Sequence, residues 1–183
     1  VIFRPAKEET THISAVVEAV KPRRSILTRP DYYDGIKPVA ANIDQIIIVS
    51  SLLPALSLNI IDRYLVASED VEITPVILLN KMDLADEEAL EIINSEMQIY
   101  EDIGYKVIQV SCKSGLGLDS LQQALIDKTS IFVGQSGVGK SSLINQLLPN
   151  VNEAIGEVSE GSGLGQHTTT CLLYTSDAAD ERL

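Results

Sequence analysis

From residue 43 onward, runs of β-branched apolar residues alternate with segments whose apolar positions recur at helical spacing. The apolar runs are 46–49, 75–79, 107–110 and 131–133, and the helical segments between them are 60–67, 87–100 and 118–126. Strands that are apolar on both faces and alternate with helices are typical of a parallel sheet covered on both sides. The pattern therefore predicts an α/β domain whose ligand lies at the carboxyl ends of the strands.

Residues 1 to 38 follow a different pattern. Apolar and polar residues alternate in short stretches at 12–20 and 26–27, and turn-forming residues follow, which predicts short strands. Residues 1–40 hold seven basic and five acidic residues, whereas the remainder holds seven basic and twenty-one acidic ones. We therefore expect the two parts to have different partners. The basic cluster Lys21-Pro22-Arg23-Arg24 fits either a solvated turn or an RNA-binding arm.

The composition excludes several classes of protein. Apolar residues make up 45% of the chain, enough for a core, but no apolar run is long enough to cross a membrane. Cys112 and Cys171, the two cysteines of the chain, cannot form a disulfide framework or a four-cysteine zinc site. We expect a cytoplasmic protein that has no membrane partner and acts as a monomer.

The strongest motif is GQSGVGKS at residues 134–141, which matches the phosphate-binding pattern G-x-x-x-x-G-K-[ST]. Glycines allow backbone N–H groups to approach phosphate oxygens, and the following helix offers its positive end. Lys140 is expected to reach the β- and γ-phosphates, and Ser141 to ligate Mg²⁺. A glycine turn that merely precedes a helix is the alternative interpretation, and the flanking strand and helix disfavour it. The helical stripe that anchors the motif is Leu143, Ile144, Leu147 and Leu148.

A second motif, Asn80-Lys81-Met82-Asp83, follows the apolar run 75–79. The carboxylate of Asp83 can accept two hydrogen bonds from guanine, whereas adenine offers no such pair of donors. Asn80 is expected to tie this loop to the phosphate loop, and the stem of Lys81 to cover the base. An ATP-binding protein is therefore disfavoured, although the tetrapeptide by itself is more often a simple turn.

A third loop, Ser111-Cys112-Lys113, follows the run 107–110. Guanine-binding domains commonly have Ser-Ala-Lys at this place and read the base oxygen with a backbone N–H. Without its neighbours this tripeptide would be an ordinary turn at a strand end. Both base-binding motifs precede the phosphate loop in this chain, which is the reverse of the order in most guanine-nucleotide switches and indicates a circular permutation.

At this point the chain resembles the circularly permuted GTPases that assist maturation of the small ribosomal subunit, the ribosome small subunit-dependent GTPase A family. The resemblance rests on NKMDL, FVGQSGVGKSSLIN and GSGLGQHTTT, together with stretches from residue 25 onward. It implies the end of an RNA-binding OB-fold at residues 1–38 and a permuted GTPase domain at 39–170. It also implies GTP or GDP and Mg²⁺ as ligands, and the small ribosomal subunit with its rRNA as partners. A zinc-binding helical domain is expected in the full-length family.

The resemblance also implies roles for individual residues. The segment 161–170 resembles the first switch region of the family, in which a threonine coordinates Mg²⁺ and a histidine is implicated in hydrolysis; read without the family, it is a flexible glycine-rich loop. His167 and Lys140 are the implied catalytic residues, and the implied metal ligands are Ser141 with Thr168, Thr169 or Thr170. The implied nucleotide-binding residues are Asn80, Lys81, Asp83, Ser111, Cys112, Lys113, Gly134, Gln135, Ser136, Gly137, Val138, Gly139, Lys140, Ser141 and Ser142.

The chain departs from the family after Thr170. The Asp-x-Pro-Gly motif of the second switch does not follow, and residues 171–183 (CLLYTSDAADERL) resemble a foreign, non-native tail that we expect to be poorly packed. We therefore expect impaired GTP hydrolysis. Two functions stay open: a GTP-hydrolysing factor in ribosome assembly, or a catalytically incompetent fragment that binds nucleotide or RNA.

Overall fold

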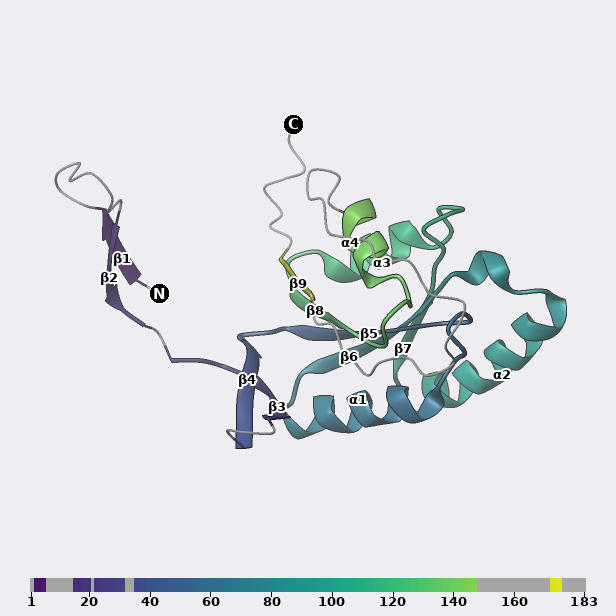
Figure 1. Cartoon of the computed structure of the whole chain (residues 1–183), viewed down its shortest axis with the longest axis horizontal. Coiled ribbons are helices and arrows are strands. Elements are labelled where there is room, and N and C mark those ends of the chain that lie inside the picture. The colour runs from purple at the N-terminus through teal and green to yellow at the C-terminus, as the bar shows by residue number, and fades with distance from the viewer. Residues whose placement is uncertain (1, 6–14, 21, 32–34, 148–171, 176–183) are drawn as a thin grey trace. The chain divides into compact units, whose positions relative to one another are not determined.

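The computed structural model describes residues 2–5, 15–20, 22–31, 35–147 and 172–175 (Figure 1). The chain divides into two compact units, residues 1–42 and residues 43–183. No helix among these described residues is long and apolar enough to cross a membrane. The described strands of each unit pair only with strands of the same unit.

The first unit contains two antiparallel pairs of strands. Strand β1 (Ile2–Pro5) pairs with β2 (Ala15–Ala19), and β3 (Ile26–Asp31) pairs with β4 (Gly35–Ala41). Asn42 closes the second pair: its backbone N–H donates to the Ser25 carbonyl at 3.0 Å, and its side-chain oxygen accepts from the Arg24 N–H at 2.8 Å. The expectation of short strands in this region is confirmed, whereas its assignment to an OB-fold stays a prediction.

The second unit is built on a five-stranded sheet in the order β7-β6-β5-β8-β9 (Figure 1). The first four strands in this order are parallel and β9 is antiparallel to β8. The strand bounds are β5 (Gln45–Ser51), β6 (Thr74–Asn80), β7 (Lys106–Gln109), β8 (Thr129–Val133) and β9 (Leu172–Thr175). The expected α/β architecture with a mostly parallel sheet is therefore confirmed.

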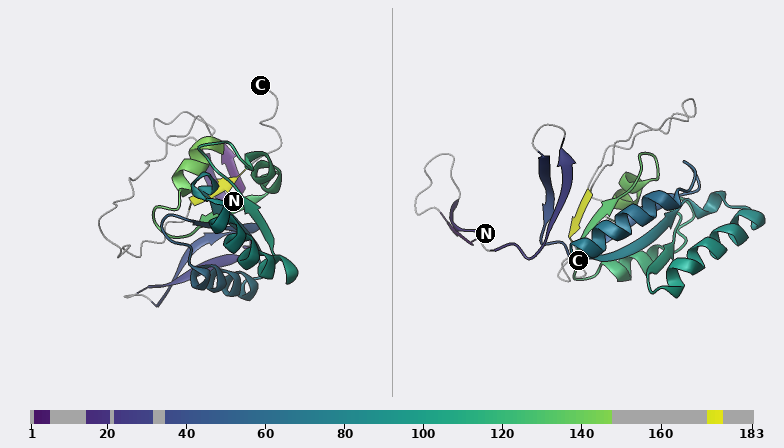
Figure 2. Two further views of the ribbon diagram at one scale, coloured as in Figure 1. Left: turned by 90° about the vertical axis from the view of Figure 1, so that its right-hand side faces the viewer. Right: turned by 90° about the horizontal axis from the view of Figure 1, so that it is seen from below.

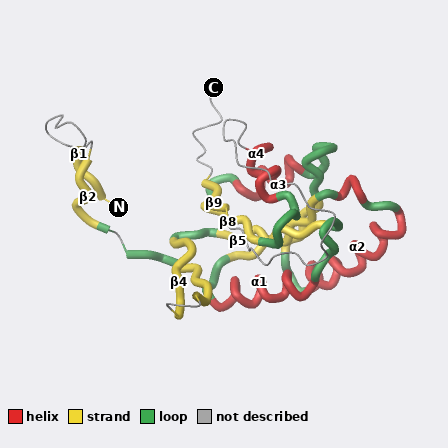
Figure 3. The backbone as a smooth tube through the Cα atoms, viewed as in Figure 1, coloured by secondary structure: helices red, strands yellow, loops and turns green. Residues whose placement is uncertain are grey.

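Helices cover both faces of this sheet (Figures 1 and 2). The helix bounds are α1 (Leu58–Asp70), the 3₁₀ turn η1 (Met82–Leu84), α2 (Glu87–Asp102), α3 (Leu118–Leu125) and α4 (Lys140–Leu147). Helices α1 and α2 lie on one face, and α3 and α4 lie on the other (Figure 3). Asp86 caps the start of α2: its carboxylate accepts a hydrogen bond from the Ala89 N–H at 2.8 Å and satisfies a donor of the first turn.

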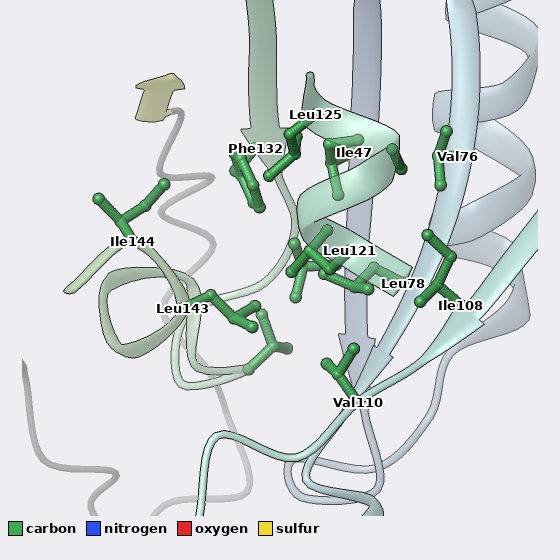
Figure 4. Packing of buried hydrophobic residues seen from close by; sticks show 13 residues of the cluster. Ile47, Val76, Leu78, Ile108, Val110, Leu121, Leu125, Phe132, Leu143 and Ile144 are labelled. Carbon is green, nitrogen blue, oxygen red and sulfur yellow. The ribbon is translucent and has the colours of Figure 1, made fainter. Parts of the chain in front are cut away.

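Alternate residues of each central strand pack against opposite helical layers. Ile47 and Phe132 belong to the cluster that contains Leu121 of α3 and Leu143 of α4 (Figure 4). Their neighbours along the strands, such as Ile46, point away from that cluster because successive side chains of a strand alternate between faces. All seven residues of β5 are buried, which explains the apolar run Ile46–Val49 at its centre.

The strand order places a topological switch point between β5 and β8. Helices α1 and α2 connect β5 to β6 and β6 to β7, and the chain then returns through α3 to β8 on the other side of β5. Right-handed crossovers in both directions put the helices on opposite faces and open a crevice at the carboxyl ends of these strands. The loops that follow β6, β7 and β8 therefore converge at one edge.

Strand β9 was not expected from the sequence. Leu172–Thr175 pair with Phe132–Thr129 of β8, so the expectation that 171–183 is poorly packed is wrong for the backbone of these four residues. The physical reason is that β8 would be an edge strand without β9, and an edge strand offers unpaired backbone groups to an extended segment. The origin of residues 171–183 stays a prediction.

Candidate functional site

The phosphate loop runs from the end of β8 into α4, as the sequence predicted. Gly134, Gly137 and Gly139 have φ values of 146°, 81° and 95°. A Cβ atom on Gly134 would lie 2.1 Å from the Val49 carbonyl oxygen, and one on Gly139 would lie 2.3 Å from Asn80 Nδ2. The first and last glycines of the motif are thus required both by backbone conformation and by close packing against neighbouring strands.

Lys140 lies inside the loop that precedes it. Its side chain is buried, and Nζ donates hydrogen bonds to the carbonyl oxygens of Gly134 at 2.9 Å and Gln135 at 2.5 Å. The ammonium group of Lys140 therefore lies at the N-terminal end of α4. The dipole of that helix and the ammonium charge both favour an anion there. Ser141 and Ser142 follow in the first turn of α4, and both are partly buried. The loop and the helix end concentrate positive potential in one small region.

Asn80 connects the loop after β6 to the phosphate loop. Its side chain is buried, and Nδ2 donates to the Val138 carbonyl oxygen at 3.0 Å. Among the described residues, the buried Oδ1 atom has no hydrogen-bond partner. The bond spans 58 positions of sequence and fixes the spacing between the two loops.

Lys81 forms the second connection. It has a φ of 63°, and Nζ donates to the carbonyl oxygens of Gly137 at 2.7 Å and Leu53 at 2.6 Å. Burial lowers the pKa of Lys81, while the nearby carboxylate of Asp83 opposes that shift. One ammonium group thus holds together the loop after β5, the loop after β6 and the phosphate loop.

Asp83 is exposed and lies in the 3₁₀ turn η1, which follows β6. Its Oδ1 atom accepts a hydrogen bond from the hydroxyl of Ser111 at 2.5 Å, and that hydroxyl also accepts from the Ser114 N–H at 3.1 Å. Ser111 is fully buried. The hydroxyl therefore fixes the direction of the Asp83 carboxylate while the carboxylate itself faces solvent.

Cys112 and Lys113 complete the third loop. Burial raises the pKa of the Cys112 thiol, and a hydrogen bond with the Asn80 side chain partly opposes the shift. Lys113 is exposed. The backbone of this loop is fixed by two bonds, from Val110 N–H to the Leu79 carbonyl at 2.7 Å and from Met82 N–H to the Val110 carbonyl at 3.1 Å. The loops after β6 and β7 are thus joined along their backbones.

The chain is similar to known proteins over most of its length. The sequence model described as RsgA GTPase matches residues 20–178. The chain belongs to the RsgA GTPase family. It is 61% identical over 174 residues to the small ribosomal subunit biogenesis GTPase RsgA of Proteus mirabilis, and 58% identical over 170 residues to the protein of the same name from Haemophilus influenzae strain PittGG. Each alignment covers 93% of this chain and 49% of the relative.

Solved structures in this group share the fold. YjeQ from Thermotoga maritima superposes with a TM-score of 0.68 and 39% identity, covering 77% of this chain and 48% of that one. YloQ, described as a circularly permuted GTPase, gives a TM-score of 0.62 and 34% identity, covering 83% and 50%. The chain therefore spans about half the length of the relatives that it matches.

The permuted order of the RsgA GTPase family is visible in this fold, because the loops after β6 and β7 precede the phosphate loop in sequence yet adjoin it in space. The sequence predicted that Asn80 ties its loop to the phosphate loop, but it marked neither the acceptor, Val138, nor the contact of Lys81 with Leu53, since a backbone carbonyl acceptor leaves no residue signature. His167, Thr168, Thr169 and Thr170 lie outside the described residues, as does Leu148 of the expected helical stripe. Among the described residues, no group of three or more His, Cys, Asp or Glu side chains is arranged to hold a metal ion.

Proposed function

We propose that this chain binds GTP and GDP at the edge formed by the loops after β6, β7 and β8, and that it acts in the biogenesis of the small ribosomal subunit. The observation that carries the proposal is the convergence of Asn80, Lys81 and the phosphate loop through two side-chain hydrogen bonds. A base-reading carboxylate and a phosphate-binding lysine on one rigid edge are what a guanine nucleotide requires.

The residues present fit the two ends of such a nucleotide. At the phosphate end, the glycines leave a cradle that a Cβ on Gly134 or Gly139 would fill, and Lys140 supplies the cation. At the base end, Asp83 accepts from the N1–H and exocyclic amine of guanine while Ser111 holds its orientation. The backbone N–H groups of the Cys112 loop read the base oxygen. Adenine would leave the carboxylate without donors.

GTP hydrolysis requires further residues besides those that hold the base and the phosphates. Ser141 and one of Thr168, Thr169 and Thr170 would hold Mg²⁺, which would supply positive charge against the phosphates. His167 positions the attacking water, because a neutral imidazole accepts a hydrogen bond from water through one nitrogen and donates through the other. Lys140 stabilises the charge that develops on the transferred phosphoryl group.

The named relatives are small ribosomal subunit biogenesis GTPases, and the proposal extends their partner to this chain. The small subunit and its rRNA are the expected partners, the cytoplasm the expected location, and the monomer the expected state. The exposed Arg23 and Arg24 of the first unit supply cations for RNA phosphates. Zinc has no part in the proposal, because Cys112 and Cys171 are the only cysteines of the chain.

Titration of fluorescent GDP, GTP and ATP against the chain tests the binding step. We expect GDP and GTP to bind, ATP to bind far more weakly, and Lys140→Ala to abolish detectable binding of triphosphate. Equal affinity for ATP would overturn the base assignment, and retained affinity of Lys140→Ala would make the loop merely structural.

GTP turnover with and without small ribosomal subunits tests the second step and separates a GTPase from a module that only binds. In a longer chain that also carries the second switch, His167→Ala should lower subunit-stimulated turnover by roughly 10²-fold while GDP affinity stays nearly unchanged. A parallel loss of GDP affinity would assign His167 a structural role.

A further inference from the structure

Helices α1 and α2 carry several large apolar side chains that are exposed. Val66 of α1 is 70% exposed, and Ile99 of α2 and Ile103, just after α2, are 59% and 66% exposed. Ile99 and Ile103 lie one helical turn apart, and Ile92, 58% exposed, lies two turns before Ile99 on the same side of α2. Single exposed apolar residues are ordinary, but a row of them on two neighbouring helices is the kind of surface that proteins use for binding.

Two tyrosine hydroxyl groups join α1 to the C-terminal part of α2 and to the turn that follows it. The hydroxyl of Tyr100 donates to Asp62 at 2.7 Å, and the hydroxyl of Tyr105, just after α2, donates to Glu69 at 3.2 Å. Val66 lies four residues after Asp62 and three before Glu69, so it shares the side of α1 that meets α2. The two bonds therefore place the side of α1 that carries Val66 next to the C-terminal part of α2.

The same region is strongly negative. Helices α1 and α2 together carry nine acidic residues and one basic residue, Arg63. Helix α1 ends in Glu69-Asp70 and α2 ends in Glu101-Asp102, and neither helix has a basic residue in its last turn. Acidic groups at a helix C-terminus add to the negative end of the helix dipole and work against helix stability. Because these acidic residues oppose helix stability where they lie, they indicate that this surface binds a cationic ligand.

We propose that residues 66–70 and 99–103, which we name the helix-end surface, dock a lysine- or arginine-rich amphipathic segment of a partner protein. Its cations meet the four terminal carboxylates and the two helix dipoles, and its apolar residues cover Val66, Ile99 and Ile103. RNA is a poor occupant because its phosphates are repelled by the same charges.

The position of the surface makes this role separate from the proposed nucleotide site. Helices α1 and α2 run opposite to the parallel strands that they connect, so their C-terminal ends lie at the amino edge of the sheet (Figure 1). The phosphate loop lies at the carboxyl edge. The partner segment and the nucleotide therefore bind at opposite edges without competing, and the docking proposal stands or falls independently of nucleotide binding.

The test uses a fluorescein-labelled peptide of about 18 residues, with leucine and lysine placed so that a helix has one apolar and one basic face, long enough to cover several turns. A second peptide with glutamate in place of lysine is the control probe. Fluorescence anisotropy should show saturable binding of the lysine peptide to the full chain, weakened by added salt, and no binding of the glutamate peptide.

Three double variants locate the binding. Glu101→Lys with Asp102→Lys should weaken peptide binding by at least about tenfold while leaving or raising the melting temperature, since it corrects the charge at the end of α2. Ile99→Ser with Ile103→Ser should also weaken binding. Glu88→Lys with Glu91→Lys makes the same change in net charge near the other end of α2 and should leave binding within about twofold, because exposed charges beyond a Debye length are largely screened.

The outcomes are distinct. Loss of binding in the first two variants with retention in the third supports the proposal. Equal loss in all three means that net charge alone attracts the peptide and overturns it, as does the absence of saturable binding. A uridine 20-mer that binds the chain and loses affinity in the Ile99→Ser, Ile103→Ser variant would identify an RNA surface instead and would also overturn it.

Discussion

The hydroxyl of Ser111 donates a hydrogen bond to the carboxylate of Asp83 across 28 positions of sequence, from the loop after β7 to the loop after β6. Ser111 is fully buried and Asp83 is exposed. A group that cannot move therefore sets the direction of a group that faces solvent. In the proposed guanine site, this bond orients the carboxylate before the base arrives, which lowers the entropic cost of binding.

Ser111→Ala should lower GDP affinity by about tenfold, the scale of one charge-assisted hydrogen bond, because the Asp83 carboxylate loses its orienting donor. Ser114→Ala is the matched control, since Ser114 is an exposed serine three residues away whose hydroxyl accepts only a long bond, 3.4 Å, from the Leu116 N–H. Fluorescent GDP titration of both variants measures the effect. A similar loss in both would mean that the whole loop, and not the Ser111 hydroxyl, is responsible.

Asp83→Asn should reverse the base preference. The amide accepts one hydrogen bond and donates one where the carboxylate accepted two, and xanthine has a carbonyl acceptor where guanine has its exocyclic amine. Guanine binding should therefore fall by at least about 10²-fold and xanthine nucleotide binding should rise. Competition of GDP and XDP for the same fluorescent ligand measures both. An unchanged order of affinities would remove Asp83 from the base site.

Gly139→Ala should destabilise the chain and weaken nucleotide binding. The added Cβ would lie 2.3 Å from Asn80 Nδ2, at a φ of 95° that strains any side chain. Gly104 has a nearly equal φ of 100° and nothing within 4 Å of its Cβ position, so Gly104→Ala isolates the backbone strain, about 1–2 kcal/mol. Urea unfolding should show a larger loss for Gly139→Ala, and equal losses would contradict the clash.

The hydrogen bond from Tyr100 of α2 to Asp62 of α1 should make the folded chain less stable at alkaline pH. Burial and the hydrogen bond to Asp62 raise the pKa of Tyr100 well above its ordinary value of 10.0. The folded state therefore holds the phenolic proton more tightly than the unfolded state, and stability should fall as pH rises above about 10. Tyr100→Phe should be less stable near pH 7 and lose less stability between pH 10 and 12, as followed by urea unfolding. Parallel curves for the two proteins would contradict this coupling.

Much of this arrangement could be predicted because its determinants are side chains at regular spacing. The apolar run 75–79 lies inside β6 (Thr74–Asn80), and the amphipathic segment 87–100 lies inside α2 (Glu87–Asp102). The motif at 134–141 occupies the turn from β8 into α4. These patterns follow directly from which faces must be buried.

The unpredicted parts depend on partners that sequence does not mark. Lys81 binds the carbonyl of Leu53, and any residue at that position would offer the same acceptor. The bond from Ser111 to Asp83 depends on the pairing of β6 with β7, which sets the two loops beside each other only in three dimensions. Strand β9 pairs through its backbone, so its apolar pattern gave no signal of where it joins the sheet.

The loop order also has a consequence for synthesis. Strands β5, β6 and β7 span residues 45–109 and pair with their neighbours in sequence, so the base-reading half leaves the ribosome first. Strand β8 joins β5 only later, across the 85 positions that separate Gln45 from Ser130. A nucleotide that binds only the complete fold cannot stabilise a shorter nascent chain. Nucleotide capture by a nascent chain would therefore mark the moment at which translation has passed Ser141.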